Sequence, residues 1–102
     1  EMNKLIRDGK VAVIVSPGYG AGFHTWGAPL EAVFDPELAD AILMGNVKSI
    51  EKIIATKYPD ITYIKGTWLN VEWVPVDAKF RIHEYDGAEE IVYLNMDDYI
   101  TA

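Results

Sequence analysis

The sequence predicts an α+β domain, with a mainly antiparallel sheet of about four to five strands and two helices packed on one face. Three observations predict this class. Residues 11–15 form a dense β-branched run, which is typical of a strand. Two segments with helical periodicity follow, at about 36–44 and 47–57. Apolar residues then recur with period two between turn signals over 61–95, which indicates a meander of strands within a single domain, residues 1–102.

The first strand is expected in the centre of the sheet. Val11 to Val15 are all apolar and lack the polar alternation of a strand with one wet face. Such runs are usually covered on both faces. Before this strand, Leu5, Ile6 and the Asp8-Gly9 pair predict a short lead-in and a turn.

Both predicted helices have clear start and stop signals. Asp35 followed by Pro36 is a favourable beginning, because the carboxylate can cap the helix and proline needs no hydrogen bond in the first turn. Gly45 is placed to end this helix. The second helix has a shared apolar face and an outward charged face. A shorter helical turn is expected at 30–34.

The remaining chain predicts strands separated by tight connections. The strand segments are 61–64, 68–76, 79–85 and 89–95. Pro75 cannot donate to a ladder, so the second of these strands lies at an edge or ends there. Asp77-Ala78 is expected to be a tight connection, and Asp86-Gly87 is a strong signal for a two-residue hairpin turn. The tail from residue 96 is left open between a helical turn, a strand end and a frayed end.

Charge and composition exclude several classes of function. The net charge is −7, and residues 60–102 carry nine acidic and three basic side chains, which disfavours binding to nucleic-acid phosphates. No apolar run approaches the roughly 20 residues of a membrane span, so no membrane association is expected. The chain has no cysteine and no apolar segment typical of a secretion signal. These observations predict a cytoplasmic protein. The acidic half is most simply explained by solubility, and a basic partner is the alternative.

Residues 16–26, which we call the glycine loop, are the best candidate for a contact site. They combine backbone freedom with chemically rich side chains, of which Tyr19, Phe23, His24 and Trp26 are the candidate ligand or partner contacts. The glycine spacing differs from that of a dinucleotide fingerprint, and no lysine follows to hold a phosphate. A phosphate-binding role is therefore disfavoured.

His24 is the side chain that could make this loop a small-molecule site or a minor active site. Its ordinary pKa lies nearest neutrality, and Glu31 or Asp35 could orient it. His24 and His83 lack the spacing of a metal site, and Ser16 lacks the elbow motif of a nucleophile. We therefore predict no catalytic residues, no metal and no cofactor, and the aromatic side chains could equally cap the core.

Two segments carry a resemblance to a known group. They are Ser-Pro-Gly-Tyr-Gly-Ala-Gly-Phe-His-Thr-Trp at 16–26 and Val-Glu-Trp-Val-Pro-Val-Asp-Ala-Lys-Phe-Arg-Ile-His-Glu-Tyr-Asp-Gly at 71–87. The chain resembles small bacteriophage and prophage proteins of unknown function. The resemblance implies an accessory protein of the bacterial cytoplasm and carries no functional residues.

The sequence thus favours a small acidic binding protein that acts on a host or self protein, and the resemblance implies a phage origin. Its contact surface would be either the glycine loop or the acidic half. The alternative is a small-molecule binder or minor enzyme that uses His24. A further alternative is a homo-oligomer that pairs through the exposed strand edge near Trp73.

Overall fold

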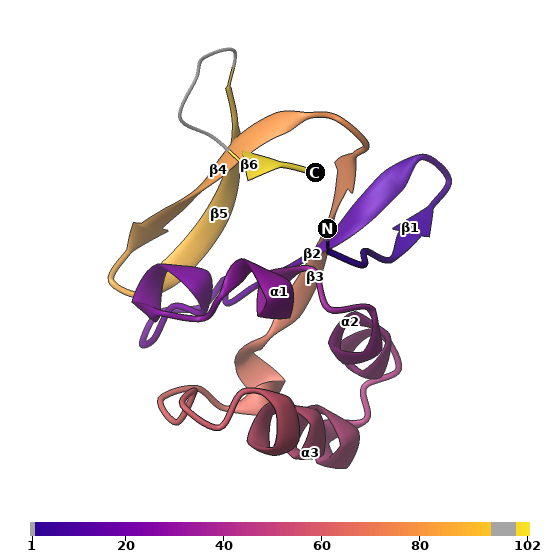
Figure 1. Ribbon diagram of the computed structural model, residues 1–102. Helices are drawn as coiled ribbons and strands as arrows, with labels where there is room; N and C mark the ends of the chain where they lie inside the picture. Colours follow the sequence, from indigo (N-terminus) through magenta and orange to yellow (C-terminus); the bar gives the residue numbers. More distant parts are fainter. Residues whose placement is uncertain (1, 95–99) are drawn as a thin grey trace.

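The computed structural model describes residues 2–94 and 100–102, and it confirms the α+β class (Figure 1). Within these ranges the chain forms two three-stranded antiparallel sheets, three α-helices and two short 3-10 helices. Phe23, Phe34 and Phe80 are fully buried in the common core. No helix in these ranges is both long and apolar enough to cross a bilayer.

The first sheet has the order β1-β2-β3, with β1 at Ile6–Arg7, β2 at Lys10–Val15 and β3 at Asn70–Pro75. β2 is the central strand, and its residues 11–15 are all buried, as its sequence predicts. The predicted turn before it has φ values of 52° at Asp8 and 74° at Gly9. These positive values are those of the two-residue turn that suits a twisted hairpin.

The second sheet has the order β5-β4-β6, with β4 at Lys79–Tyr85, β5 at Ala88–Tyr93 and β6 at Ile100–Thr101. The Asp86-Gly87 turn joins β4 to β5 with φ values of 51° and 86°, which confirms the predicted hairpin. The short β6 shows that part of the tail ends as a strand. Residue 95, the end of the last predicted strand, and residues 96–99 of the tail lie outside the described residues.

The prediction of an antiparallel sheet with four to five strands is confirmed only in part, because the chain turns a corner between β3 and β4 and its strands form two sheets. Pro75 offers no N–H to a continuing ladder, and Asp77 has a φ of 69°. The Val76 N–H bonds the Gly9 oxygen, and the Ala78 N–H bonds the Pro75 oxygen. The predicted tight connection therefore directs β4 into a second sheet instead of pairing it with β3.

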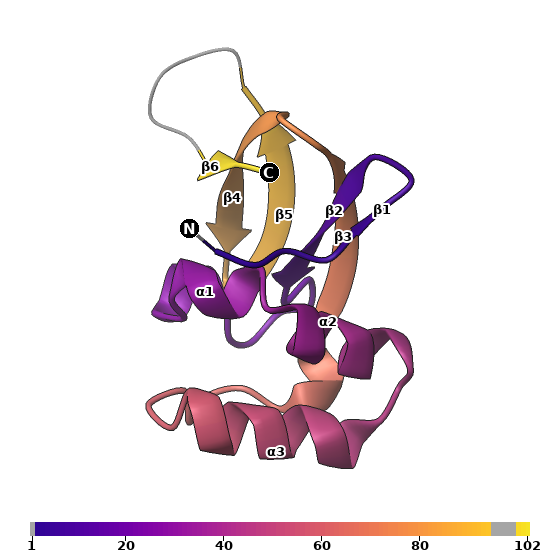
Figure 2. The same ribbon diagram turned by 45° about the vertical axis from the view of Figure 1, so that its right-hand side comes forward.

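The helices are α1 at Leu30–Val33, α2 at Pro36–Leu43 and α3 at Val47–Lys57, so both predicted helices and the shorter turn are confirmed. The short helices are η1 at His24–Trp26 and η2 at Gly66–Trp68. α1 and α2 pack on β2, and α3 packs on α2 as a further layer (Figure 2). Val47, at the start of α3, is exposed.

The prediction of a strand at 61–64 is also wrong. The Ile61 N–H bonds the Tyr58 oxygen in a turn, and the segment continues without regular structure to η2. Ile61 is buried and Ile64 is partly buried in the core cluster. Their apolar spacing reflects anchoring of an irregular connection to the core, and it mimics the period of a strand.

Candidate functional site

The glycine loop is folded around the carboxylate of Glu89, which is only 3% exposed. One carboxylate oxygen accepts the Ser16 N–H at 2.9 Å. The other accepts the N–H groups of Phe23 and Thr25, each at 2.9 Å, and the Thr25 hydroxyl at 2.6 Å. Successive backbone N–H groups directed at one point form an anion-binding nest. The glycine loop therefore has the character of an anion cradle, and the anion in it is the chain's own Glu89.

Two glycines allow the loop backbone to lie close to Glu89 and to the β4–β5 hairpin. A Cβ at Gly22 would lie 2.7 Å from the Trp26 ring and 3.1 Å from the Glu89 carboxylate. A Cβ at Gly87 would lie 2.6 Å from the backbone of Gly20. The loop and the β4–β5 hairpin thus meet backbone to backbone, and the Gly20 N–H bonds the Asp86 oxygen at 3.0 Å.

Two of the four predicted contact residues point into the protein. Phe23 is fully buried in the core, and its oxygen accepts the Tyr63 hydroxyl at 3.1 Å. Burial and the negative charge of Glu89 raise the pKa of Tyr63. His24 is half-buried, with Nδ1 at 2.7 Å from the Ala28 oxygen.

The carboxylates expected to orient His24 are engaged elsewhere. The Tyr58 hydroxyl donates to Asp35 at 2.6 Å, and the Leu38 N–H donates to the same carboxylate at the start of α2. Glu31 is exposed on α1, and its described contact is through its backbone oxygen to Tyr58. The predicted pairing of His24 with Glu31 or Asp35 is therefore wrong.

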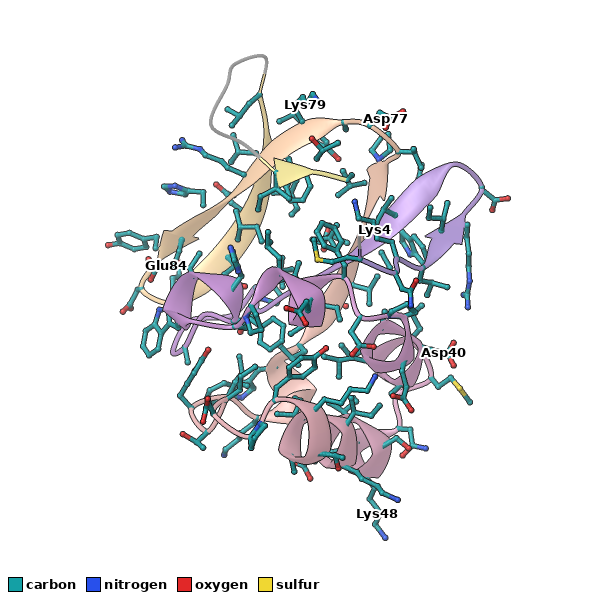
Figure 3. All side chains as sticks on the ribbon, viewed as in Figure 1. Lys4, Asp40, Lys48, Asp77, Lys79 and Glu84 are labelled. Atoms are coloured by element: carbon teal, nitrogen blue, oxygen red, sulfur yellow. The ribbon has the colours of Figure 1, made fainter. Side chains whose placement is uncertain are left out.

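The other two predicted residues are exposed but lie on separate cavities. Tyr19 is 74% exposed and borders a cavity at β3 and β5. Trp26 is 47% exposed and borders a second cavity, of about 420 Å³, with its ring centroid 6.2 Å from that of Tyr63. The Trp26 Nε1 donates to Glu84 at 3.4 Å, and Figure 3 shows Glu84 at the hairpin end of β4. The four residues do not form one site.

The cavity beside Tyr19 is a groove of about 610 Å³ between β3 and β5, which we call the strand groove. Its volume is within the range of about 300–1,000 Å³ that is common for ligand sites. The lining residues come from both sheets and from the glycine loop: Pro17, Tyr19, Glu72, Trp73, Val74, His83, Tyr85, Ala88, Glu89, Glu90, Ile91 and Tyr93.

The strand groove combines aromatic rings with negative charge. Four rings line it, those of Tyr19, Trp73, Tyr85 and Tyr93. Tyr85 is 72% exposed, so most of its ring is open to solvent. The exposed carboxylates of Glu72 and Glu90 lie on the two sides of the groove. This set of side chains suits a cationic ligand with apolar parts.

Sequence reasoning missed most of this groove. From the sequence, Trp73 is expected near an exposed strand edge, and Tyr85 lies in a predicted strand without an assigned role. The available signal was an aromatic residue on each of three consecutive strands, within a segment rich in carboxylates. That signal becomes a site only when the corner after β3 brings the strands together.

A second polar cluster centres on Asp35, which is 5% exposed at the N-terminus of α2. Besides Tyr58, the Lys57 ammonium contacts its carboxylate at 3.2 Å. Burial opposes the charged form, but the hydrogen bonds from Tyr58, Leu38 and Lys57 outweigh it, and the pKa of Asp35 lies below 3.8. Burial and the neighbouring Asp35 carboxylate raise the pKa of Tyr58, so this hydroxyl is held as a donor and is not activated as a base.

We expect Asp35→Asn to lower the free energy of unfolding at neutral pH by about 1–3 kcal/mol, since hydrogen bonds to a charged group are lost. A carboxylate with a lowered folded pKa contributes stability above its unfolded pKa and loses it as the pH falls through the folded value. The difference between the variant and the parent should therefore shrink below about pH 4. Urea unfolding at neutral pH and below about pH 4 measures this difference, with the exposed Asp60→Asn as a matched control. An equal difference at both pH values would contradict this assignment.

Within residues 2–94 and 100–102, no cluster of histidine and carboxylate side chains has the arrangement of a metal site. Comparison with protein families, with curated proteins and with solved structures finds no match to the chain.

Proposed function

We propose that this protein is a non-enzymatic binding protein that holds an extended, basic segment of a partner protein in the strand groove. The observation that carries the proposal is the lining of the groove, in which exposed rings stand beside Glu72 and Glu90 between two strands. Both bordering strands end their sheets, so an extended chain can lie along them. The four other cavities compared among the described residues are lined by three aromatic rings at most.

The rings favour lysine or arginine over a purely apolar ligand. A cation is attracted to the face of tryptophan or tyrosine when it lies within about 6 Å of the ring centre. Trp73 already makes such a contact, with the Arg7 guanidinium carbon 5.9 Å from its ring centre. Tyr19 and Tyr85 offer further faces that are open to solvent.

The net charge of the whole molecule also favours a basic partner. A net charge of −7 attracts a basic partner over long range and repels a second copy of this chain. The carboxylates of Glu72 and Glu90 then provide local pairs for individual ammonium or guanidinium groups. A basic protein segment is therefore favoured over a homodimer.

The proposal unites the two contact surfaces that the sequence left as alternatives. Tyr19 of the glycine loop and the acidic side chains of β3 and β5 border the same groove. The resemblance to phage and prophage proteins points to a host protein as the source of the segment. The small-molecule alternative has less support, because His24 bonds the Ala28 oxygen and lines none of the cavities described above.

The test is selection of random peptides displayed on beads against the immobilised full chain. We expect the selected peptides to be enriched in lysine and arginine alternating with apolar residues, because the groove presents carboxylates and rings. The double variant Glu72→Lys, Glu90→Lys should bind them at least about tenfold more weakly, in line with two lost charge pairs and two repulsions.

The matched control is Glu51→Lys on α3, an exposed charge reversal outside the groove. Its affinity for the same peptides should stay within about twofold, apart from the general effect of net charge. Selection of acidic or purely apolar peptides, or equal loss in the control and the double variant, would overturn the proposal.

A further inference from the structure

The two strands that border the strand groove each have an outer edge. In the two sheets, β3 and β5 are terminal strands, and among the described residues neither has a second strand neighbour. Edge strands expose a row of backbone N–H and C=O groups that can pair with another chain. A partner strand could bond only those backbone groups that point away from the rest of the sheet.

The hydrogen bonds between β5 and β4 show which backbone groups of β5 point away from β4. The Leu94 N–H bonds the Lys79 oxygen, and residue pairs of an antiparallel ladder alternate between bonded and non-bonded. The backbone N–H and C=O groups of Glu90 and Val92 therefore point toward β4. Those of Ile91 and Tyr93 point away from β4, toward the outer edge of the sheet. The same alternation directs the Glu89 N–H outward, and it donates to the Ser16 oxygen at 2.8 Å.

One outward backbone group of β5, the Glu89 N–H, is thus already hydrogen-bonded within the protein, as it would be to a neighbouring strand. Ser16 occupies this first outward position, and the next two outward positions, Ile91 and Tyr93, border the strand groove. The facing edge of β3 is less suited, because it ends at Pro75, which has no N–H. The β5 edge, in contrast, contains no proline, and its second half, residues 91–93, has high β propensity.

We infer that the basic segment binds by strand addition, forming backbone hydrogen bonds to Ile91 and Tyr93 on the outer edge of β5. This inference rests on the proposed function and adds its mode of recognition. Residues of an added strand alternate between the two faces of the sheet. Basic residues would lie beside Glu90, and apolar residues would lie beside Ile91 and Tyr93 on the opposite face. Backbone bonds supply affinity, and the two faces supply selectivity.

The decisive experiment uses a short capped peptide of alternating lysine and valine and two versions with the same side chains. One version is N-methylated at every lysine and the other at every valine. Strand addition to one edge uses the N–H groups of one alternate set only. We expect one methylated version to bind at least about tenfold more weakly than the parent and the other to bind within about threefold. Loss at valine indicates an antiparallel addition, and loss at lysine a parallel one.

A protein variant tests the same bonds from the other side. Ile91→Pro removes an N–H that faces away from β4, so the β4–β5 ladder is kept. Ile91→Ala removes a similar part of the side chain and keeps the N–H. We expect the proline variant to bind the parent peptide at least about tenfold more weakly than the alanine variant does. Circular dichroism of both variants checks that the fold is retained.

The outcomes separate the two levels of the proposal. If the parent peptide fails to bind the unmodified protein even at low salt, the proposed function is wrong. If the parent binds and both methylated versions bind equally well, or both lose binding, addition to the β5 edge is wrong while the groove remains the site. The methylated peptides act on the unmodified protein, so this result does not depend on the folding of any variant.

Discussion

Glu89→Ala is expected to lower the free energy of unfolding by about 3–5 kcal/mol, a large part of the roughly 5–15 kcal/mol typical of a domain. The reason is that it leaves the N–H groups of Ser16, Phe23 and Thr25 without their acceptor. A buried donor without a partner costs about 1–3 kcal/mol, and Thr25 contributes less because it is exposed. Urea unfolding followed by tryptophan fluorescence measures the change.

Two further variants separate the role of the carboxylate from that of side-chain bulk. Glu89→Gln keeps the shape but places an NH₂ group against backbone donors, so we expect a loss of about 2–3 kcal/mol. Glu90→Gln changes the exposed neighbour on the same strand and should cost no more than about 0.5 kcal/mol. Equal stability of the two glutamine variants would show that the glycine loop does not depend on Glu89.

Gly87→Ala is the second substitution with a large expected effect, and the sequence provides its control. Gly9 and Gly87 each follow an aspartate in a two-residue hairpin turn, with φ values of 74° and 86°. Alanine is strained in this region by about 1–2 kcal/mol in both turns. Only at Gly87 would the added methyl also lie within 2.8 Å of loop backbone atoms, whereas at Gly9 no atom lies within 4 Å.

We therefore expect Gly9→Ala to cost about 1–2 kcal/mol and Gly87→Ala about 3–5 kcal/mol, the difference being displacement of the glycine loop. Thermal unfolding of both variants measures this difference. In the Gly87 variant the Gly20 amide should also lose its protection from hydrogen exchange, since its bond to the Asp86 oxygen depends on the close contact. Equal costs in the two turns would mean that the hairpin does not support the loop.

The local elements of the fold were predictable because their signals are local. Asp35 caps α2 through bonds to the next residues along the chain, and the two Asp-Gly pairs form hairpin turns through their own backbone preferences. The buried strand β2 follows from its uninterrupted apolar run. These features depend on residues that are close together in the sequence, so pattern and propensity are sufficient.

The two-sheet arrangement and the site were not predictable, because they depend on contacts between distant residues. Glu89 bonds the Ser16 N–H across 73 positions, and no feature near either residue reveals its partner. The glycine spacing of the loop was seen, but its purpose is to surround an internal carboxylate. The strand groove exists because Pro75 and Asp77 turn the chain out of the first sheet, and only this corner brings Tyr85 near Trp73.

The glycine loop has the backbone flexibility of a phosphate-binding loop but carries no phosphate-binding side chains. Its N–H groups are already directed at Glu89, and its one exposed aromatic residue beside the strand groove is Tyr19. The loop thereby fixes one wall of the groove. The carboxylate is a positioning group, and the partner is met by the side chains around it.

The most direct test of the strand groove is a nuclear magnetic resonance titration of the full chain with the capped peptide of alternating lysine and valine. The account predicts saturable shifts of the amides of Trp73, Ile91 and Tyr93 and of the Tyr19 ring, and these shifts should weaken as salt is added. Shifts confined to α2 and α3, or an absence of saturable shifts at low salt, would contradict it.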